Sequence, residues 1–341
     1  MWRMVVLLVC VLGLRAAHAD TTVTVTLSNE GQMLAQAMGV SPAELAMQVK
    51  SKIDEAYQTA RINSFLKEFT NATSFSQRGI GVDYSSAPTG FMVGMAANLA
   101  VAGNPDIHDK QHITGGLAAN FSLMLGMNLS EWGHKKWTVF ANGFYQEASL
   151  GDLEGSITSA GAHVQYNVLQ PAASGGAGTA VRWLGLSLTS GLEYTRWNFG
   201  TGGTELTTPF DLSGGGMTVP VSFDSTGRFD LRSTALTVPI EVSTGLRIAL
   251  IASVFVGAGI DLTPGGSSTL DAGLTGNVHT EDGRDLGAVT ITGDGDSKGS
   301  PGQFRLLAGG QVNLWKLKIF VQANVSQAPA ASVALGLKFV N

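Results

Sequence analysis

From about residue 90 onward, apolar residues alternate with small or polar residues with a period of two. In 91–101 every second residue is apolar, and most residues between them are glycine, alanine or asparagine. In 184–194 leucine and tyrosine alternate mainly with glycine, serine, threonine and glutamate. Successive side chains of a β-strand point to opposite faces of the sheet, so this alternation predicts strands.

Ten segments follow this pattern, and they are long for soluble sheets, where strands of about five or six residues prevail. Strands of about ten residues are the length that crosses a bilayer. The segments are centred on 91–101, 113–128, 137–147, 162–168, 184–195, 236–243, 250–262, 304–314, 317–326 and 333–339. Two further segments, 79–84 and 218–223, raise the count to twelve if they also form strands.

The polar face of these strands distinguishes a membrane barrel from a soluble sandwich. A sandwich exposes many charged residues on its outward face, whereas here that face is mainly Gly, Ser, Thr, Asn and Gln. The few charges on the strands lie on this same small, polar face: Glu193, Glu241, Arg305, Lys318 and Lys338. Apolar residues toward lipid and polar residues toward a lumen indicate an antiparallel, up-and-down transmembrane β-barrel, with these charges lining the lumen.

The lengths of the connections agree with a barrel that has short periplasmic turns and long outer loops. With the last strand ending in the periplasm, the links 129–135, 170–181, 247–249 and 315–316 are periplasmic. The outer links are 102–111, 148–156, 198–233, 263–302 and 327–330, and the two longest are both outer. Aromatic girdles are then expected at the periplasmic rim (Trp132, Trp137, Trp183, Trp315 and Phe339) and at the outer rim (Tyr194 and Trp197).

One amphipathic helix is expected before the barrel, over 42–69. Ser41 suits the N-cap, Pro42 the first helical position and Glu44 the capping-box partner. Apolar residues then recur at helical spacing. This segment, 20–76, either packs on the rest of the protein, plugs the barrel, makes a periplasmic contact or lies on the lipid surface.

The first residues have the pattern of an export signal. Arg3 precedes an apolar stretch over 4–14, and Ala17 and Ala19 provide the small residues that signal peptidase requires. We therefore expect cleavage after Ala19 and a barrel domain over 77–341. The sole cysteine, Cys10, lies in the signal, so no disulfide is expected in the mature chain.

At residues 333–339, the sequence Val-Ala-Leu-Gly-Leu-Lys-Phe resembles the C-terminal strand signal of Gram-negative outer-membrane β-barrel proteins. Together with the alternating segments, the resemblance covers about 89–341. It implies an outer-membrane location, contact with outer-membrane lipid and insertion by the barrel assembly machinery. Members of this superfamily usually end in an aromatic residue, whereas here Val340 and Asn341 follow Phe339.

Composition narrows the possible functions. Charged residues make up 14% of the chain, against about 25% in typical soluble domains. The formal net charge is −5, and loss of the two arginines in the signal makes it about −7. An acidic chain is not expected to bind nucleic acid. No nucleotide fingerprint or nucleophile elbow is present, and no cofactor is expected.

One outer link carries residue types that could bind a cation: Asp106, His108, Asp109 and His112. Ordinary solvated loop polarity is the favoured explanation for them. The sequence favours a non-enzymatic, narrow, porin-like channel for small solutes. The first alternative is a structural envelope protein or adhesin that binds an extracellular partner through 198–233 and 263–302. The second is a hydrolase that uses Asp106, His108 and Asp109.

Overall fold

The computed structural model describes residues 22–57, 62–85, 90–103, 115–170, 181–249 and 251–341. Its helices are α2 (Asn29–Ala37), α3 (Pro42–Tyr57), α4 (Ile62–Phe75) and the short 3₁₀ helix η1 (Leu129–Trp132). Its strands are β1 (Thr22–Leu27), β2 (Phe91–Ala102), β3 (Gly116–Asn128), β4 (Trp137–Leu150), β5 (Leu153–Leu169), β6 (Val181–Gly214), β7 (Met217–Ile248), β8 (Ala252–Leu262), β9 (Ser267–Thr280), β10 (Asp285–Lys298), β11 (Gly302–Leu314), β12 (Leu317–Ser326) and β13 (Ala330–Val340).

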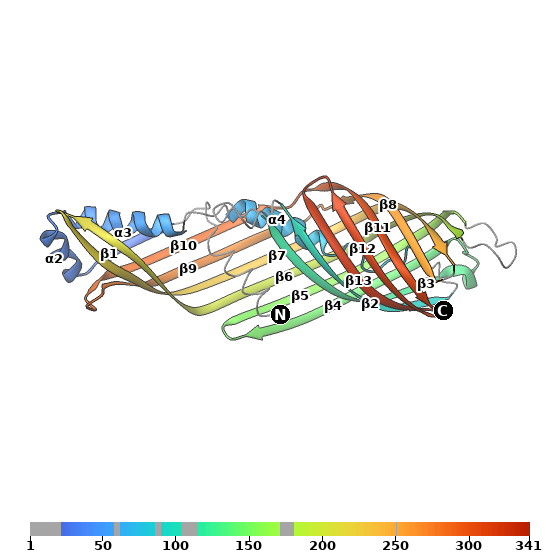
Figure 1. Cartoon of the computed structure of the whole chain (residues 1–341), viewed down its shortest axis with the longest axis horizontal. Helices are drawn as coiled ribbons and strands as arrows, with labels where there is room; N and C mark the ends of the chain where they lie inside the picture. Colours follow the sequence, from blue (N-terminus) through green and yellow to red (C-terminus); the bar gives the residue numbers. More distant parts are fainter. Residues whose placement is uncertain (1–21, 58–61, 86–89, 104–114, 171–180, 250) are drawn as a thin grey trace.

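In the described part of the chain, ten of the strands close into a ring, β2 to β8 followed by β11 to β13 (Figure 1). The ring closes where β13 pairs antiparallel with β2 and where β7 pairs with β8. No helix within the described ranges has the length and hydropathy needed to cross a bilayer. The closed ring of strand pairings confirms the predicted fold class, an antiparallel barrel of ten strands.

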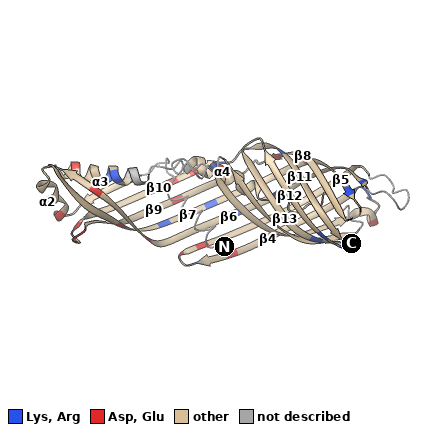
Figure 2. Cartoon of the chain, in the orientation of Figure 1, with Lys and Arg blue, Asp and Glu red and all other residues tan. Residues whose placement is uncertain are grey.

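The two faces of the ring have opposite polarity. On β12 and β13, the outward residues Val321 and Leu335 are 47% and 60% exposed, whereas the inward residues Gln322, Asn324 and Lys338 are buried. Figure 2 shows few charged residues along the middle of the ring strands. An apolar outer face of this kind has a favourable environment in lipid, where hydrocarbon takes the place of water.

The same sheet extends beyond one end of the ring. The hairpin β6–β7 extends past the ring, and β9, β10 and β1 add to its edge in that order. Helices α2 and α3 lie along this extension (Figure 1). We call β1, α2, α3, β9, β10 and the parts of β6 and β7 between 198 and 233 the outer module.

The polarity of the strands reverses where they leave the ring. On β7, the outward positions Ile240 and Val242 of the ring give way to Asp224, Arg228 and Arg232 in the outer module, all on the same side of the strand. The inward side changes from polar to apolar and forms one core with the helices. This core contains Val23, Ala35, Met38, Leu45, Val49, Ile53, Leu212, Val221, Phe223, Leu274, Val278, Leu286, Val289 and Ile291. The reversal marks the level at which the lipid ends.

The structure corrects three expectations. Residues 198–233 and 263–302 are largely strands and not loops, because they pair with each other and with β1 outside the membrane, where alternation has the opposite sense. Residues 218–223 lie within β7 and add no separate strand. Residues 79–84 form no strand, since they lie inside the ring and not in its wall.

The expected single helix over 42–69 is represented by two helices with different environments. α3 contributes Leu45, Val49 and Ile53 to the core of the outer module. α4 belongs to a second core inside the ring and continues to Phe75. The separation has a physical cause, because the two apolar stripes pack against surfaces in different parts of the molecule.

The predicted cap of α3 is present. The backbone N–H of Ser41 donates to Glu44 Oε2 (2.7 Å), and the N–H of Glu44 donates to Ser41 Oγ (3.2 Å). The backbone hydrogen bond from Ser41 lowers the pKa of Glu44, and its side-chain hydrogen bond acts in the same direction. These reciprocal bonds satisfy two N–H groups that a helix start otherwise leaves without partners.

We expect Glu44→Ala to increase hydrogen exchange in the first turn of α3 at neutral pH. Because folding lowers the pKa of Glu44, its stabilising effect is present above the unfolded-state pKa and is lost as the pH falls through the folded-state value. The difference between Glu44→Ala and the unmodified protein should therefore shrink on acidification. Lys50→Ala, an exposed change further along α3, is the control, and an equal effect of both variants would contradict the capping role.

Candidate functional site

Helix α4 lies at the end of the lumen next to the outer module and closes it. Its apolar residues form a core with side chains of the ring and of the adjoining outer module: Phe65, Leu66, Phe69, Ala72 and Phe75 pack with Ala100, Ala118, Ile157, Trp197, Leu231, Leu270 and Ala330. The rings of Phe69 and Trp197 meet edge to face with centroids 5.8 Å apart. A helix that touches the wall on many sides leaves no clear bore at this level.

A close backbone approach holds α4 against β3. Gly116, at the start of β3, lies where a Cβ would overlap the backbone of Glu68 and Phe69. Only a glycine lets the helix and strand approach so closely without displacement of one of them. The position of α4 therefore depends on a residue in the barrel wall.

The other side of α4 forms hydrogen bonds with the polar wall. The hydroxyls of Thr70 and Ser268 are 2.6 Å apart, and those of Ser74 and Thr237 are 2.9 Å apart. The backbone N–H of Ser300 donates to Asn71 Oδ1 (2.8 Å). Thr237 of the ring and Ser268 and Ser300 of the segment 263–302, which the sequence analysis expected to be an outer loop, thus bind the polar face of the helix.

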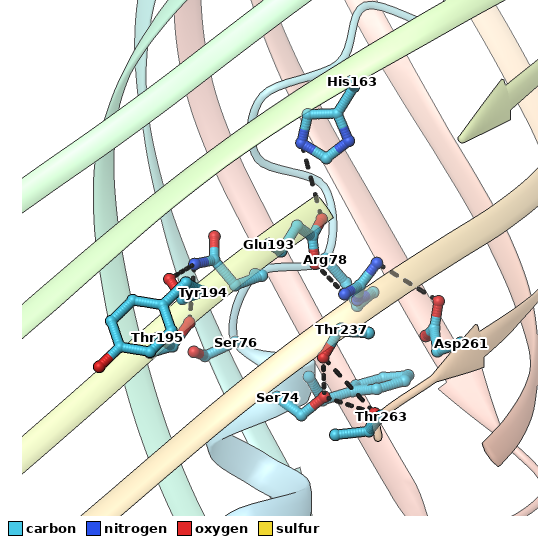
Figure 3. A network of polar contacts seen from close by, with 12 residues as sticks. Ser74, Ser76, Arg78, His163, Glu193, Tyr194, Thr195, Thr237, Asp261 and Thr263 are labelled. Atoms are coloured by element: carbon cyan, nitrogen blue, oxygen red, sulfur yellow. Dashed lines mark hydrogen bonds and ion pairs between the residues drawn. The ribbon is translucent and has the colours of Figure 1, made fainter. Parts of the chain in front are cut away.

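After α4, residues 76–85 continue through the lumen without regular secondary structure (Figure 3). Asn98 of β2 donates through Nδ2 to the carbonyl oxygens of Ser76 (2.8 Å) and Arg78 (2.6 Å). Gln77 Nε2 donates to Thr195 Oγ1 (2.7 Å). Every residue from 69 to 83 is buried, so this segment occupies the lumen and is covered by the wall on all sides.

A network of ion pairs fixes the segment to the wall (Figure 3). Arg78 pairs with Glu193 and, at 3.3 Å, with Asp261. Arg305 pairs with Asp261 (3.0 Å) and with Glu241 (2.6 Å). All five side chains are at most 3% exposed. In such a buried site each charge is costly without its partner, so the network favours one position of the segment.

A second ion pair lies further along the lumen. Lys338 Nζ donates to Asp83 Oδ1 (2.7 Å), and both side chains are buried. Lys338 belongs to the last strand and Asp83 to the lumen segment, so this pair connects the two ends of the barrel sequence.

Four of the five predicted lumen charges, Glu193, Glu241, Arg305 and Lys338, are buried inside the ring. Lys318 is half-buried, and its Nζ donates to the carbonyl of Trp315 in the turn between β11 and β12. The prediction missed the role of Arg78 and Asp83. The signal was available, since they are the sole charged residues between 69 and 90.

A group of basic residues lies at the end of the ring opposite the outer module. Arg182 and Arg247 are opposite each other on β6 and β7, and Lys318 is on β12. Within the described ranges, the buried Nε atoms of both arginines have no hydrogen-bond partner. Like charges placed directly opposite destabilise a sheet, so this arrangement is not explained by stability.

Six of the seven residues predicted for the aromatic girdles are exposed. Trp132, Trp137, Trp183, Trp315 and Phe339 are at least 40% exposed, and Tyr194 is 37% exposed. Trp197 is only 6% exposed and packs inside the ring, so its assignment to the girdle is wrong. Tyr194 and Trp197 are an odd number of residues apart on one strand and must face opposite sides.

The weak cation candidates Asp106, His108, Asp109 and His112 lie outside the described residues. Among the residues that are described, no group of three or more His, Cys, Asp or Glu side chains could hold a metal ion. The hydrolase hypothesis depends on the same undescribed residues, so it stays a prediction from the sequence.

Comparison with known proteins gives one family match. A family model described as Lsa36-like matches residues 16–341. No curated protein matches the chain.

Solved structures similar to the chain include three bacterial outer-membrane proteins. The translocator domain of the autotransporter NalP from Neisseria meningitidis is 11% identical, over 80% of this chain and 93% of that one, with a TM-score of 0.28. Ail, the attachment invasion locus protein of Yersinia pestis, is 9% identical, over 73% and 97%, with a TM-score of 0.24. The outer membrane protein Omp33 of Acinetobacter baumannii is 10% identical, over 75% and 99%, with a TM-score of 0.28. At such low scores the barrel assignment rests on the strand pairing and polarity described above.

Proposed function

The chain belongs to the Lsa36-like family, and we propose that it is a sealed outer-membrane anchor that presents the outer module at the cell surface. The observation that carries this proposal is that residues 62–85 fill the lumen while the two longest links form a folded module at one end. The proposal has no catalytic step. It makes the outer module the surface through which an extracellular partner is bound.

The strand connections support placing the module outside the cell. The ring ends with β13, and two of the links at that end are short: β7 to β8 and β11 to β12 are joined by three and two residues, 249–251 and 315–316. The other two, 129–136 and 170–180, have eight and eleven residues. The long β6–β7 and β9–β10 hairpins leave the ring at the opposite end. Outer-membrane barrels have short periplasmic turns and long extracellular loops.

The energetics of the filled lumen support a sealed barrel. Exposing a buried Phe or Leu side chain costs about 1.5–3 kcal/mol, and α4 buries several of these side chains. Separating one partner of a buried ion pair costs about 3–5 kcal/mol. Displacing residues 62–85 would break both kinds of contact together, so the open state is expected to be rare.

We expect the purified protein, folded in detergent and reconstituted into planar bilayers, to carry no steady ion current. A faster-migrating band on a denaturing gel without boiling establishes that the barrel is folded. An epitope inserted between Gly215 and Gly216, in the exposed β6–β7 turn, should be recognised by antibody on intact cells. A steady current together with an inaccessible epitope would contradict the proposal.

The narrow channel for small solutes is the second candidate. The row of charged groups from Arg305 to Lys338 and the basic group at the end of the ring opposite the outer module favour it, because an anion could be attracted into the lumen. In this case the bilayer experiment should give a current that Glu241→Gln or Lys318→Gln alters. Such a current would require residues 62–85 to move away from the wall.

A further inference from the structure

The first described residues lie at one end of the barrel, whereas the first strand of the barrel wall starts at the opposite end. β1 pairs with β10 in the outer module, and α2 and α3 pack in the same core. β2 begins at Phe91 near the end of the last strand, where the N–H of Gly90 donates to the carbonyl of Asn341 (3.2 Å). Figure 1 shows β1 and α2 at one extreme and the C-terminus toward the other.

The connection between these two ends runs through the ring. α4 is surrounded by wall residues at the outer end of the lumen, and Arg78 pairs with Glu193 deeper within it. Asp83 pairs with Lys338 of the last strand. Residues 62–85 therefore cross the barrel on its inside, and their N-terminal side emerges at the outer module.

We propose that this barrel exports its own N-terminal segment through its lumen. A secreted chain enters the outer membrane from the periplasm, so β1, α2 and α3 must cross the membrane before the outer module is complete. In the proposed step, residues 22–57 pass outward unfolded as one limb of a hairpin, while 76–85 remain as the stationary limb. α4 then closes the outer mouth. The proposal rests on the outward placement of the module, and not on any partner that it binds.

Where α4 lies, the wall has small inward side chains. Ala100 of β2, Ala118 of β3 and Ala330 of β13 pack against this helix. Larger inward side chains, Met92, Phe140 and Phe320, lie further along and pack against Ile80 and Val82 of the lumen segment. A ring with large inward residues at every level would be filled by its own side chains. The small ones leave room at the outer end for a passing chain and later for α4.

Folding of the module supplies a driving force that needs no nucleotide. Before residues 22–57 arrive, the apolar inner face of the module, including Phe223, Leu274 and Val289, lacks its cover. The arriving Leu45, Val49 and Ile53 become almost completely buried against this face. Burying apolar area favours the exported state and opposes return. β1 also gains a ladder of pairs with β10 that is available only outside.

The first arm of the test locates the N-terminal segment. In a Cys10→Ala background, Met47→Cys in α3 and Lys135→Cys in the β3–β4 link both place a thiol at an exposed position. Met47→Cys should react with a membrane-impermeant maleimide on intact cells as fully as after permeabilisation. Lys135→Cys should lose its labelling unless the cells are permeabilised.

The second arm tests the route. A small domain that folds only when its disulfide forms is fused ahead of Thr22, since the periplasm oxidises thiols. The oxidised fusion should lose surface labelling at Met47→Cys, because a folded domain cannot enter the lumen. A version of the domain with serines in place of its own cysteines should restore the labelling. The same oxidised domain placed between Trp315 and Lys316, in a periplasmic turn, should leave it unchanged.

A lumen cross-link reports whether α4 reaches its place. Ser74→Cys with Thr237→Cys, whose native hydroxyls are 2.9 Å apart, should form a disulfide in the serine-substituted fusion but not in the stalled one. Equal surface labelling of the oxidised and serine-substituted fusions would overturn self-export. An accessible 215–216 epitope with a protected Met47→Cys would also overturn it and leave the proposed function intact. An inaccessible epitope would count against both.

Discussion

Arg305→Met should destabilise the folded barrel more than any surface charge change. Arg305 is 1% exposed and pairs with Glu241 and Asp261. Removing it leaves Glu241 without its ion-pair partner in a dry lumen, and Asp261 keeps only Arg78. Loss of one partner of a buried ion pair costs about 3–5 kcal/mol. The midpoint of urea unfolding in lipid vesicles, followed by tryptophan fluorescence, should fall accordingly.

The chain contains a matched control for this change. Arg232 pairs with Asp230 at 2.8 Å, close to the 3.0 Å between Arg305 and Asp261, but its side chain is 61% exposed. Exposed pairs contribute little because water screens them, so Arg232→Met should leave the midpoint nearly unchanged. Combining Arg305→Met with Glu241→Gln and Asp261→Asn should recover much of the lost stability. Equal midpoints for Arg305→Met and Arg232→Met would contradict the role of the network.

Gly116→Leu should displace α4 and open the outer end of the lumen. Its side chain would overlap the backbone of Glu68 and Phe69. Strain from overpacking is about 1–3 kcal/mol, and each 1.4 kcal/mol is a tenfold change in population. We therefore expect trypsin to cleave after the buried Arg78 about ten to a hundred times faster than in the unmodified protein, in proportion to the open population.

Gly143→Leu is the control for this prediction. Gly143 of β4 pairs with Leu123, whose side chain is 62% exposed on the lipid face. The nearest atom to a Cβ at Gly143 is 3.7 Å away, so Gly143→Leu should not change cleavage at Arg78. Both variants should keep the faster migration of the unboiled barrel. Unchanged cleavage in Gly116→Leu would show that α4 does not depend on this approach.

The alternation of residues alone was enough to predict the barrel, because each residue's preference for lipid or lumen depends on its own side chain. It located the ring strands and the periplasmic turns, and the 315–316 turn is as expected. The same local property identified Glu193, Glu241, Arg305 and Lys338 as inward residues. Trp197 was misplaced because its aromatic type was given more weight than its position in the alternation.

Alternation could not assign the outer module correctly. In 198–233 the polar side chains point outward and the apolar ones inward, which is the reverse of the ring. A strand outside lipid can have this arrangement only if something covers its apolar face. That cover, α2 and α3, lies far away in the sequence, so the pattern of 198–233 by itself was compatible with a long loop.

The sequence by itself determined a closed, lipid-facing barrel and a capped amphipathic helix, since both depend on neighbouring residues and their spacing. Only the tertiary structure decided that α3 packs on the outer module and that α4 enters the lumen. It also decided the partners of the buried charges, as with Arg78 and Glu193, which are 115 residues apart. Such contacts join residues that are far apart in the sequence, and a local periodicity holds no information about which distant residues meet.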